Sequence, residues 1–154
     1  MQGTAPSDGL PLYLDAHGDW FDGPDEITHP GIRRYLYEHL TFDPGQGFMV
    51  RNDRQARVVE VEDVPFAVLR TTPRLNSEGS SSSYTLLLSD ECQEVLDPGT
   101  LHWGERNILY CHVKGRAFRA RFSRPAYLQL AWRVEEDPES GSFYLPVGNR
   151  KHYL

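Results

Sequence analysis

The stretch that decides the fold is VVEVEDVPFAVLRT, residues 58–71. Valine and glutamate alternate as far as Glu62, which is the period of a strand with one face in solvent. After Asp63 the pattern changes, because residues 64–69 place apolar side chains on both sides of an extended backbone. A strand that is apolar on both sides is buried on both sides. We therefore expect a second layer to cover this strand, and two similar units that face each other would supply it from the other half of the chain.

The composition is that of a soluble globular protein with one compact domain or two very small ones. The 154 residues are 39% hydrophobic and 25% charged, and a chain of this length can bury a sizeable core. The net charge of −6 argues against wholesale binding to nucleic acid or to an anionic membrane. A cytoplasmic protein is expected, because the N-terminus lacks a signal-peptide pattern, no apolar run is long enough for a membrane span, and two cysteines make no disulfide framework.

The first half predicts one α+β unit, residues 12–71, after a flexible tail at residues 1–11. The expected elements are strands at 12–14 and 20–21, a helix started by Thr28 and Pro30 and ended by DPGQG, and a hairpin that turns near Asn52-Asp53. The apolar side of the helix consists of Ile32, Tyr35, Leu36 and Leu40.

The second half predicts another unit of the same kind, residues 84–148. A serine-rich loop at 72–83 precedes it and a tail at 149–154 follows it. The expected elements are two strands within 84–99, a hairpin over 107–122 that turns at Lys114-Gly115, a helix capped by Ser123, and a short strand at 142–148. The apolar stripe of this helix is Tyr127, Leu130, Ala131 and Val134.

The order of these elements indicates an internal duplication. Each half contains a short hairpin, a longer hairpin and one helix introduced by a proline. The helix lies between the hairpins in the first half and after them in the second. The fold class is therefore α+β, in two similar units, and each unit would provide the cover that the other lacks.

Three segments of the chain resemble, in order, parts of the bacterial domain-of-unknown-function family 1285. They are HGDWFDGPDEI at 17–27, ARVVEVEDVPFAV at 56–68 and LYCHVKGRAFRARFSRPAYLQLAW at 109–132. The resemblance implies a duplicated α+β fold whose second half is superficially like a pleckstrin-homology domain. It also implies a site between the halves for a nucleotide-like ligand, and a role in signalling. The chain departs from the family at residues 87–90, where Leu-Leu-Ser-Asp replaces the usual Arg-Thr-Asn strand.

The candidate anion site comes from a basic segment in this acidic protein. From Arg106 to Val134 the chain has seven basic residues and no acidic one. Arg119 and Arg121 point the same way on an alternating strand, and Arg124 follows at the start of the helix. A guanidinium fork fits phosphate, and a helix N-terminus adds backbone N–H groups. The alternative is a solvated face whose arginines form weak surface ion pairs.

Other residues complete this hypothesis, each with a plainer alternative. Trp20 and Tyr127 are candidates to stack on the organic part of the ligand, or else they belong to the core. The remaining candidates, which either contact the ligand or form ion pairs and a rigid turn, are Arg51, Arg57, Glu62 and Asp63.

Catalytic and metal-binding motifs are not found in the sequence. His17 lies in one turn with two aspartates, but no spacing typical of zinc ligands occurs. There is also no P-loop, no glycine-rich dinucleotide motif and no nucleophile elbow. We therefore predict no catalytic residue, no metal and no cofactor. The prediction is a small binding protein with a regulatory role, and the alternatives are a protein-interaction module or an enzyme whose site is not recognised.

Overall fold

The computed structural model describes residues 10–154, so most of the predicted tail at 1–11 lies outside the described residues. The chain divides into two compact units, the first ending at Pro65 and the second running from Phe66 to Leu154. The stretch that opens the sequence analysis straddles this division. Its alternating part belongs to the first unit, where Val59 is buried and Glu60 is exposed. Its doubly apolar part, residues 64–69, crosses the division and continues into the first strand of the second unit.

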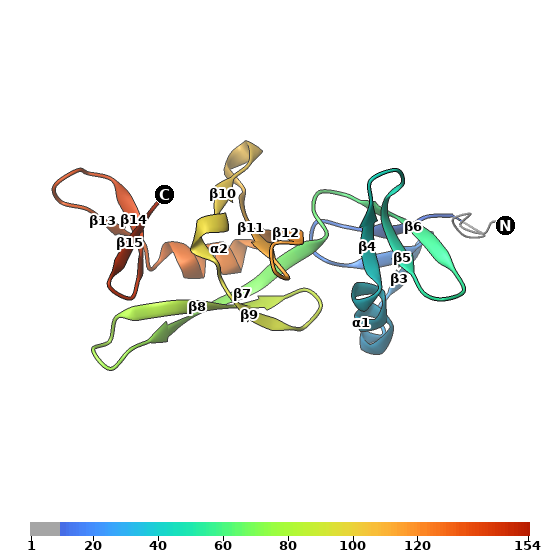
Figure 1. Cartoon of the computed structure of the whole chain (residues 1–154), viewed down its shortest axis with the longest axis horizontal. Helices are drawn as coiled ribbons and strands as arrows, with labels where there is room; N and C mark the ends of the chain where they lie inside the picture. The colour runs from blue at the N-terminus through green and yellow to red at the C-terminus, as the bar shows by residue number, and fades with distance from the viewer. Residues whose placement is uncertain (1–9) are drawn as a thin grey trace. The chain divides into compact units, whose positions relative to one another are not determined.

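The first unit is a six-stranded mixed sheet with one helix (Figure 1). Its elements are β1 (Leu12–Leu14), β2 (Trp20–Asp22), β3 (Asp25–Ile27), α1 (Pro30–Glu38), β4 (Leu40–Asp43), β5 (Gly47–Arg51) and β6 (Ala56–Val61). The strand order is β3-β2-β1-β6-β5-β4. All neighbours are antiparallel except β1 and β6, which are parallel.

Helix α1 begins one residue later and ends earlier than its expected signals. The residue before a proline avoids the helical region, so His29 is the cap, and its Nδ1 accepts hydrogen bonds from the N–H groups of Gly31 (3.0 Å) and Ile32 (3.3 Å). The prediction that Thr28 caps the helix is therefore wrong by one residue. The helix ends at Glu38, and the DPGQG stretch instead connects β4 to β5.

The second unit holds another six-stranded mixed sheet, one helix and a small third sheet. Its elements are β7 (Phe66–Leu75), β8 (Ser81–Leu88), β9 (Gln93–Val95), η1 (Pro98–Thr100), β10 (His102–Trp103), η2 (Glu105–Asn107), β11 (Leu109–Val113), β12 (Phe118–Phe122), α2 (Arg124–Ala131), β13 (Glu135–Glu136), β14 (Phe143–Val147) and β15 (Arg150–Tyr153). The larger sheet has the order β10-β11-β12-β7-β8-β9, and the smaller is β13-β14-β15. Within the larger sheet only β7 and β12 are parallel.

The two six-stranded sheets have the same topology. Each consists of two three-stranded antiparallel meanders, and the first strand of the first meander pairs in parallel with the last strand of the second. The helix lies between the meanders in the first unit and after them in the second, as the sequence predicted. The α+β class is thus confirmed, with a repeated sheet arrangement. The likeness of the second unit to a pleckstrin-homology domain stays a prediction.

Two predicted irregular segments are strands. Most of the supposed serine-rich loop at 72–83 belongs to the β7–β8 hairpin, whose turn is tied by Asn76 through bonds to the N–H groups of Glu78 and Ser80. The hydroxyl of Ser82 donates to the carbonyl of Arg74 on the partner strand (2.9 Å). Cross-strand pairing therefore overrides a composition typical of loops. The supposed tail at 149–154 contains β15, which pairs with β14.

The cover for the doubly apolar strand includes the helix of its own unit. Strand β7 pairs with β12 only as far as Val68. Beyond that point α2 lies beside β7, because the N–H of Ser123 donates to the carbonyl of Val68 (2.9 Å) and the N–H of Thr71 donates to Oε1 of Gln129 (2.8 Å). The expectation that the other half covers this strand stays a prediction.

Candidate functional site

A polar face on strands β10, β11 and β12 carries the basic residues that the sequence singled out. Its members, which we call the basic-aromatic face, are His102, Tyr110, His112, Arg119 and Arg121. The strand register sets Tyr110 opposite both His102 and Arg121, and His112 opposite Arg119. Because successive side chains alternate between faces, these five share one side of the sheet. The opposite side is apolar: Cys111 and Ala120 are fully buried there.

Arg119 is held on this face by neutral groups. Its guanidinium carbon lies 4.6 Å from the centre of the Tyr110 ring, and its Nη2 lies 3.1 Å from Nε2 of His102. A guanidinium only donates hydrogen bonds, so Nε2 of His102 must be the acceptor. Nδ1 of His102 then carries the proton and donates to the carbonyl of Thr100 at 2.8 Å. The contacts assign one tautomer to His102 and one orientation to Arg119.

The charge of Arg119 is not matched by a carboxylate. Among residues 10–154 it forms no ion pair, whereas its neighbour Arg116 makes two hydrogen bonds to Oδ2 of Asp97, at 2.8 and 3.0 Å. The hydrogen bond from Arg116 holds the pKa of Asp97 below its ordinary value, against a smaller opposing effect of burial. The face therefore presents a positive charge that is braced by aromatic rings but not neutralised by an acid.

Arg121 and Arg124 are placed differently from each other. Arg121 is half-buried on the basic-aromatic face and lies opposite Ala67 of β7 in the sheet. Arg124 is exposed at the first residue of α2, outside the sheet that carries Arg119 and Arg121. The predicted cap is confirmed, since the hydroxyl of Ser123 accepts a hydrogen bond from the N–H of Ala126. Two of the three predicted arginines thus share one face.

The two candidate stacking residues have different surroundings. Trp20 is fully buried in the first unit, with its ring 5.2 Å from that of Tyr37 in an edge-on contact. That burial fits the core alternative. Tyr127 is half-buried on α2, and its ring meets that of Trp103 at 5.9 Å and 72°. Because Trp103 follows His102 on β10, Tyr127 lies on the side of the sheet opposite to the basic-aromatic face.

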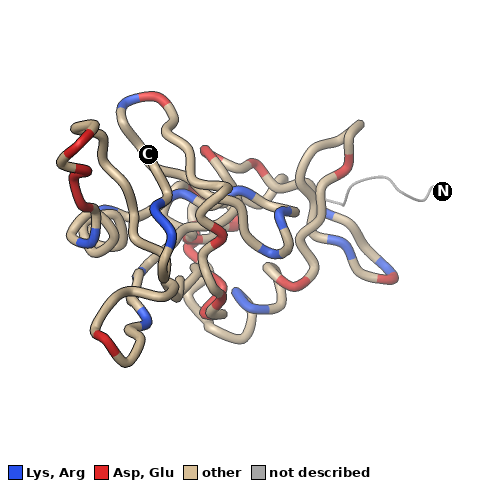
Figure 2. Tube along the Cα trace, turned by 60° about the vertical axis from the view of Figure 1, so that its left-hand side comes forward, with Lys and Arg blue, Asp and Glu red and all other residues tan. Residues whose placement is uncertain are grey.

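The candidates of the first unit make local contacts. Arg57 pairs with Asp22 (3.2 Å), and Nη2 of Arg51 lies 3.8 Å from a carboxylate oxygen of Asp43. Glu62 accepts a hydrogen bond from the N–H of Ala16 (2.8 Å). Asp63 is exposed in the turn that follows β6. Basic and acidic residues occur along the traces of both units (Figure 2). In the first unit the ion pairs of Arg51 and Arg57 agree with the alternative, in which the arginines form weak surface ion pairs.

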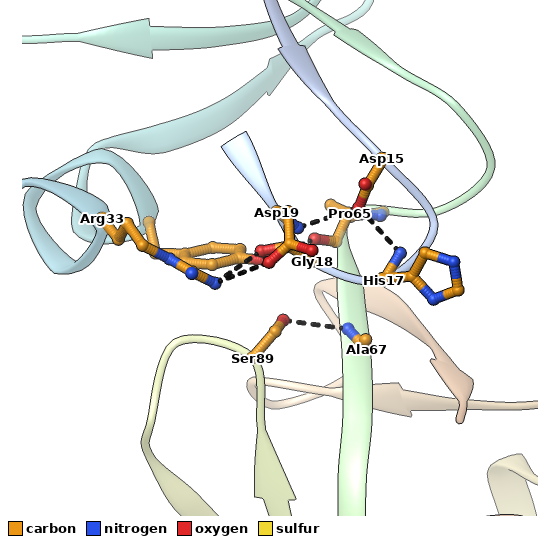
Figure 3. Close-up of polar contacts among 9 residues, drawn as sticks. Asp15, His17, Gly18, Asp19, Arg33, Pro65, Ala67 and Ser89 are labelled. Carbon is orange, nitrogen blue, oxygen red and sulfur yellow. Dashed lines mark hydrogen bonds and ion pairs between the residues drawn. The ribbon is translucent and has the colours of Figure 1, made fainter. Parts of the chain in front are cut away.

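The histidine turn of the first unit is a hydrogen-bonded loop (Figure 3). Oδ1 of Asp15 accepts from the N–H groups of His17 and Asp19, each at 2.9 Å. Arg33 donates to the carbonyl of Gly18 (3.0 Å) and forms an ion pair with Asp19 (3.3 Å). These carboxylates therefore serve the turn itself. No cluster of three metal-ligating side chains occurs in residues 10–154.

Sequence reasoning missed an apolar pocket of about 500 Å³ in the second unit. It is lined by Leu101, Trp103, Leu109, Tyr127, Leu130, Ala131, Val134, Ser142, Phe143, Leu145 and Leu154. The signal was present, because all four residues of the predicted apolar stripe of α2 are in this lining. The stripe indicated a core contact, and it did not indicate that the contact leaves open space.

Cys111 has none of the properties of a reactive thiol. It is fully buried on β11, and burial together with the charges of Glu94 and Asp97 raises its pKa to about 12. The thiolate, which is the nucleophilic form, is therefore scarce at neutral pH.

Neither α1 nor α2 is long and apolar enough to cross a membrane, and these are the α-helices of the described residues.

These features define an α+β protein of two units with a repeated sheet topology, a basic-aromatic face and an apolar pocket. Two solved structures share this fold. The first, a DUF1285 family protein from Silicibacter pomeroyi DSS-3, has a TM-score of 0.73 and 17% identity, over 95% of this chain and 80% of that one. The second, a DUF1285 family protein from Shewanella baltica OS155, has a TM-score of 0.63 and 15% identity, over 84% of this chain and 93% of that one.

At these identities the likeness concerns the fold, and at that level it confirms the resemblance to the DUF1285 family that the motifs indicated. No family profile matches the chain, and no curated protein matches it.

Proposed function

We propose that the protein is a cytoplasmic binding protein for an anionic, nucleotide-like small molecule, and that the basic-aromatic face supplies the anion contact. The observation that carries the proposal is the state of Arg119. Its guanidinium is held by Tyr110 and His102, and among residues 10–154 it forms no ion pair with an acidic side chain.

The geometry around Arg119 supports an anion as the missing partner. A guanidinium has five N–H donors, and the hydrogen bond to His102 uses one of them. Stacking on Tyr110 reduces the motion of the side chain, so less conformational entropy is lost when a ligand binds. Arg121, across the strand pair from Tyr110, places a second guanidinium on the same face. Two such groups suit a phosphate, which takes bidentate contacts from arginine.

The biological role within this proposal is regulation or signalling, and it derives from the family resemblance alone. The predicted position of the ligand between the two units stays a prediction. Arg124, Trp20 and the candidates of the first unit are not needed for the anion contact proposed here.

A thermal-shift screen tests the proposal with inorganic phosphate, nucleoside monophosphates and diphosphates, and cyclic nucleotides as probes. A ligand at a hundred times its Kd adds about 2.7 kcal/mol to the free energy of unfolding. For a unit of 60–100 residues, in which 1 kcal/mol corresponds to about 4–8 °C, we expect the melting temperature to rise by roughly 11–22 °C. Turnover of a nucleotide in the same samples would instead favour the enzyme alternative.

Matched variants locate the site. Arg119→Gln removes the unpaired charge, and we expect the affinity for the active probe to fall roughly tenfold or more, as for loss of a charge-assisted hydrogen bond. Arg116→Gln removes a neighbouring arginine that already has an acidic partner, so it should leave the affinity unchanged. Flat melting curves across the panel, or equal losses in both variants, would refute the proposal.

A second candidate function, protein interaction, is favoured by one exposed aromatic residue. Trp132 is 88% exposed and Leu128 is 49% exposed at the edge of a shallow groove between α2 and β7. Large apolar side chains that gather in solvent often mark interaction surfaces. Sedimentation at rising protein concentration tests the simplest case, a second copy of the chain. Association that Trp132→Ala abolishes would support this function, and a monomer at all concentrations would count against it.

A further inference from the structure

We propose that the apolar pocket of the second unit is a binding site for an uncharged, ring-containing small molecule. This ligand differs in chemistry and in location from the anion of the proposed function. The inference does not depend on the basic-aromatic face, and either site can fail without the other.

Three separate parts of the second unit build the walls of the pocket. Trp103 and Leu109 come from the paired strands β10 and β11, and the stripe of α2 forms a second wall. Phe143 and Leu145 come from β14 of the small sheet, which follows α2 in the chain. A pocket bounded by strands, a helix and a second sheet differs from a flat apolar face. It has the concave form of a small-molecule site rather than that of a protein interface.

The chemistry of the lining selects the ligand. No charged side chain contributes to it, and the only polar side chain besides the ring-bearing Trp103 and Tyr127 is Ser142. A charged molecule would lose its hydration there without gaining a partner. The volume of about 500 Å³ falls within the range of small-molecule sites, roughly 300–1,000 Å³. An apolar molecule with one or two ring systems matches both the size and the surface.

Aromatic rings at the mouth of the pocket are available for contact. Trp103 is 46% exposed and Phe143 is 55% exposed, although both belong to the lining. Trp103 is already set edge-on to Tyr127, which is a preferred geometry of aromatic pairs. Within residues 10–154 the indole N–H of Trp103 and the hydroxyl of Tyr127 have no hydrogen-bond partner. These two groups are therefore open to a weakly polar substituent on the ligand.

The pocket and the basic-aromatic face lie on opposite sides of the same two strands. Trp103 and Leu109 are directly paired across β10 and β11, and they alternate with His102 and Tyr110. Side chains at successive positions point to opposite faces of a strand. A ligand in the pocket therefore has no access to Arg119. An uncharged probe and an anionic probe should report on the two sites separately.

N-Phenyl-1-naphthylamine, an uncharged dye that fluoresces in apolar surroundings, is a suitable probe for the full-length chain. We expect a saturable rise in fluorescence with one site per chain. Ala131→Phe adds a ring inside the pocket and should weaken dye binding at least about tenfold, because an overpacked site has no room for a ligand. Leu128→Phe adds a ring to the same helix outside the pocket lining and serves as the matched control.

Further measurements keep the test decisive if Ala131→Phe does not fold. Phe143→Ser changes an exposed residue at the mouth of the pocket. The variant should therefore keep the circular dichroism spectrum of the wild type and still bind the dye more weakly. Arg119→Gln should leave dye binding unchanged. Non-saturable fluorescence, equal binding by the Ala131 and Leu128 variants, or a dimer that excludes the dye would each overturn the inference. The last result would assign the pocket to a second copy of the chain.

Discussion

Replacing Gln129 by methionine tests how α2 holds strand β7. The N–H of Thr71 donates to Oε1 of Gln129 at 2.8 Å, at the part of β7 that β12 no longer accompanies. Methionine has a similar length and an apolar end, so Gln129→Met removes the acceptor with little change in volume. Thr71 is only 3% exposed, and its N–H would lose its partner in a buried position.

The expected cost follows from the burial of the two groups. A buried donor without a partner costs about 1–3 kcal/mol. Gln129 itself is exposed, so water can approach from its side, and we expect the lower end, about 1 kcal/mol. For a unit of 60–100 residues this corresponds to a fall in melting temperature of about 4–8 °C. The matched control is Gln129→Glu, which keeps an acceptor oxygen and should retain most of the stability.

Two measurements decide the outcome. Urea unfolding followed by tryptophan fluorescence gives the change in free energy, and amide hydrogen exchange gives the protection of the Thr71 N–H itself. We expect faster exchange at Thr71 in Gln129→Met than in Gln129→Glu. If the methionine variant equals the wild type in stability and in protection of this amide, the role assigned to Gln129 is wrong. Equal destabilisation by both variants would also contradict it.

Three further predictions concern single groups of the fold. The hydroxyl of Thr71 is buried without a partner. Thr71→Val should therefore raise the free energy of unfolding, measured by urea, by up to about 1 kcal/mol, and a lower value than in the wild type would contradict this. A side chain at Gly104 would meet the ring of Tyr110, with Cδ2 at 3.0 Å, so Gly104→Ala should shift that ring and weaken anion binding on Arg119, as a titration with the active probe would show. The hydrogen bond from Tyr153, followed by one from the N–H of Glu139, lowers the pKa of Asp137. Its contribution to stability is therefore present above the ordinary carboxyl pKa of about 3.9 and lost as pH falls through the lowered value. Between pH 6 and pH 3 the urea midpoint should fall less for Asp137→Asn than for the wild type. An equal fall in both proteins would exclude this role.

The hairpin and helix of the second unit are the parts that sequence reasoning predicted best. The alternation of Phe118, Ala120 and Phe122 with two arginines indicated β12, and Ser123 was correctly placed as the cap of α2. Both signals are local, since strand period and helix capping depend on residues within one turn or one strand. The same reasoning placed Arg119 and Arg121 on one face, which the register with β11 confirms.

Local signals failed where a distant segment determined the structure. The serine tract forms β8 because it pairs with β7 and packs beside β14, where the hydroxyl of Tyr84 donates to the carbonyl of Pro146 (2.7 Å). No rule of composition includes that partner. The contacts of Arg119 with His102 and Tyr110 likewise depend on the folding of β10 against β11.

By itself, the sequence determined the α+β class, the two units, the faces of the strands and the positions of most turns. These properties follow from periodicity and from the backbone preferences of single residues. Only the tertiary structure decided which strands pair in parallel, which helix packs against β7, where the apolar pocket lies and which groups hold Arg119. The physical reason is that each of these depends on side chains far apart in the chain, whose packing and charge pairing exist only once the sheets have formed.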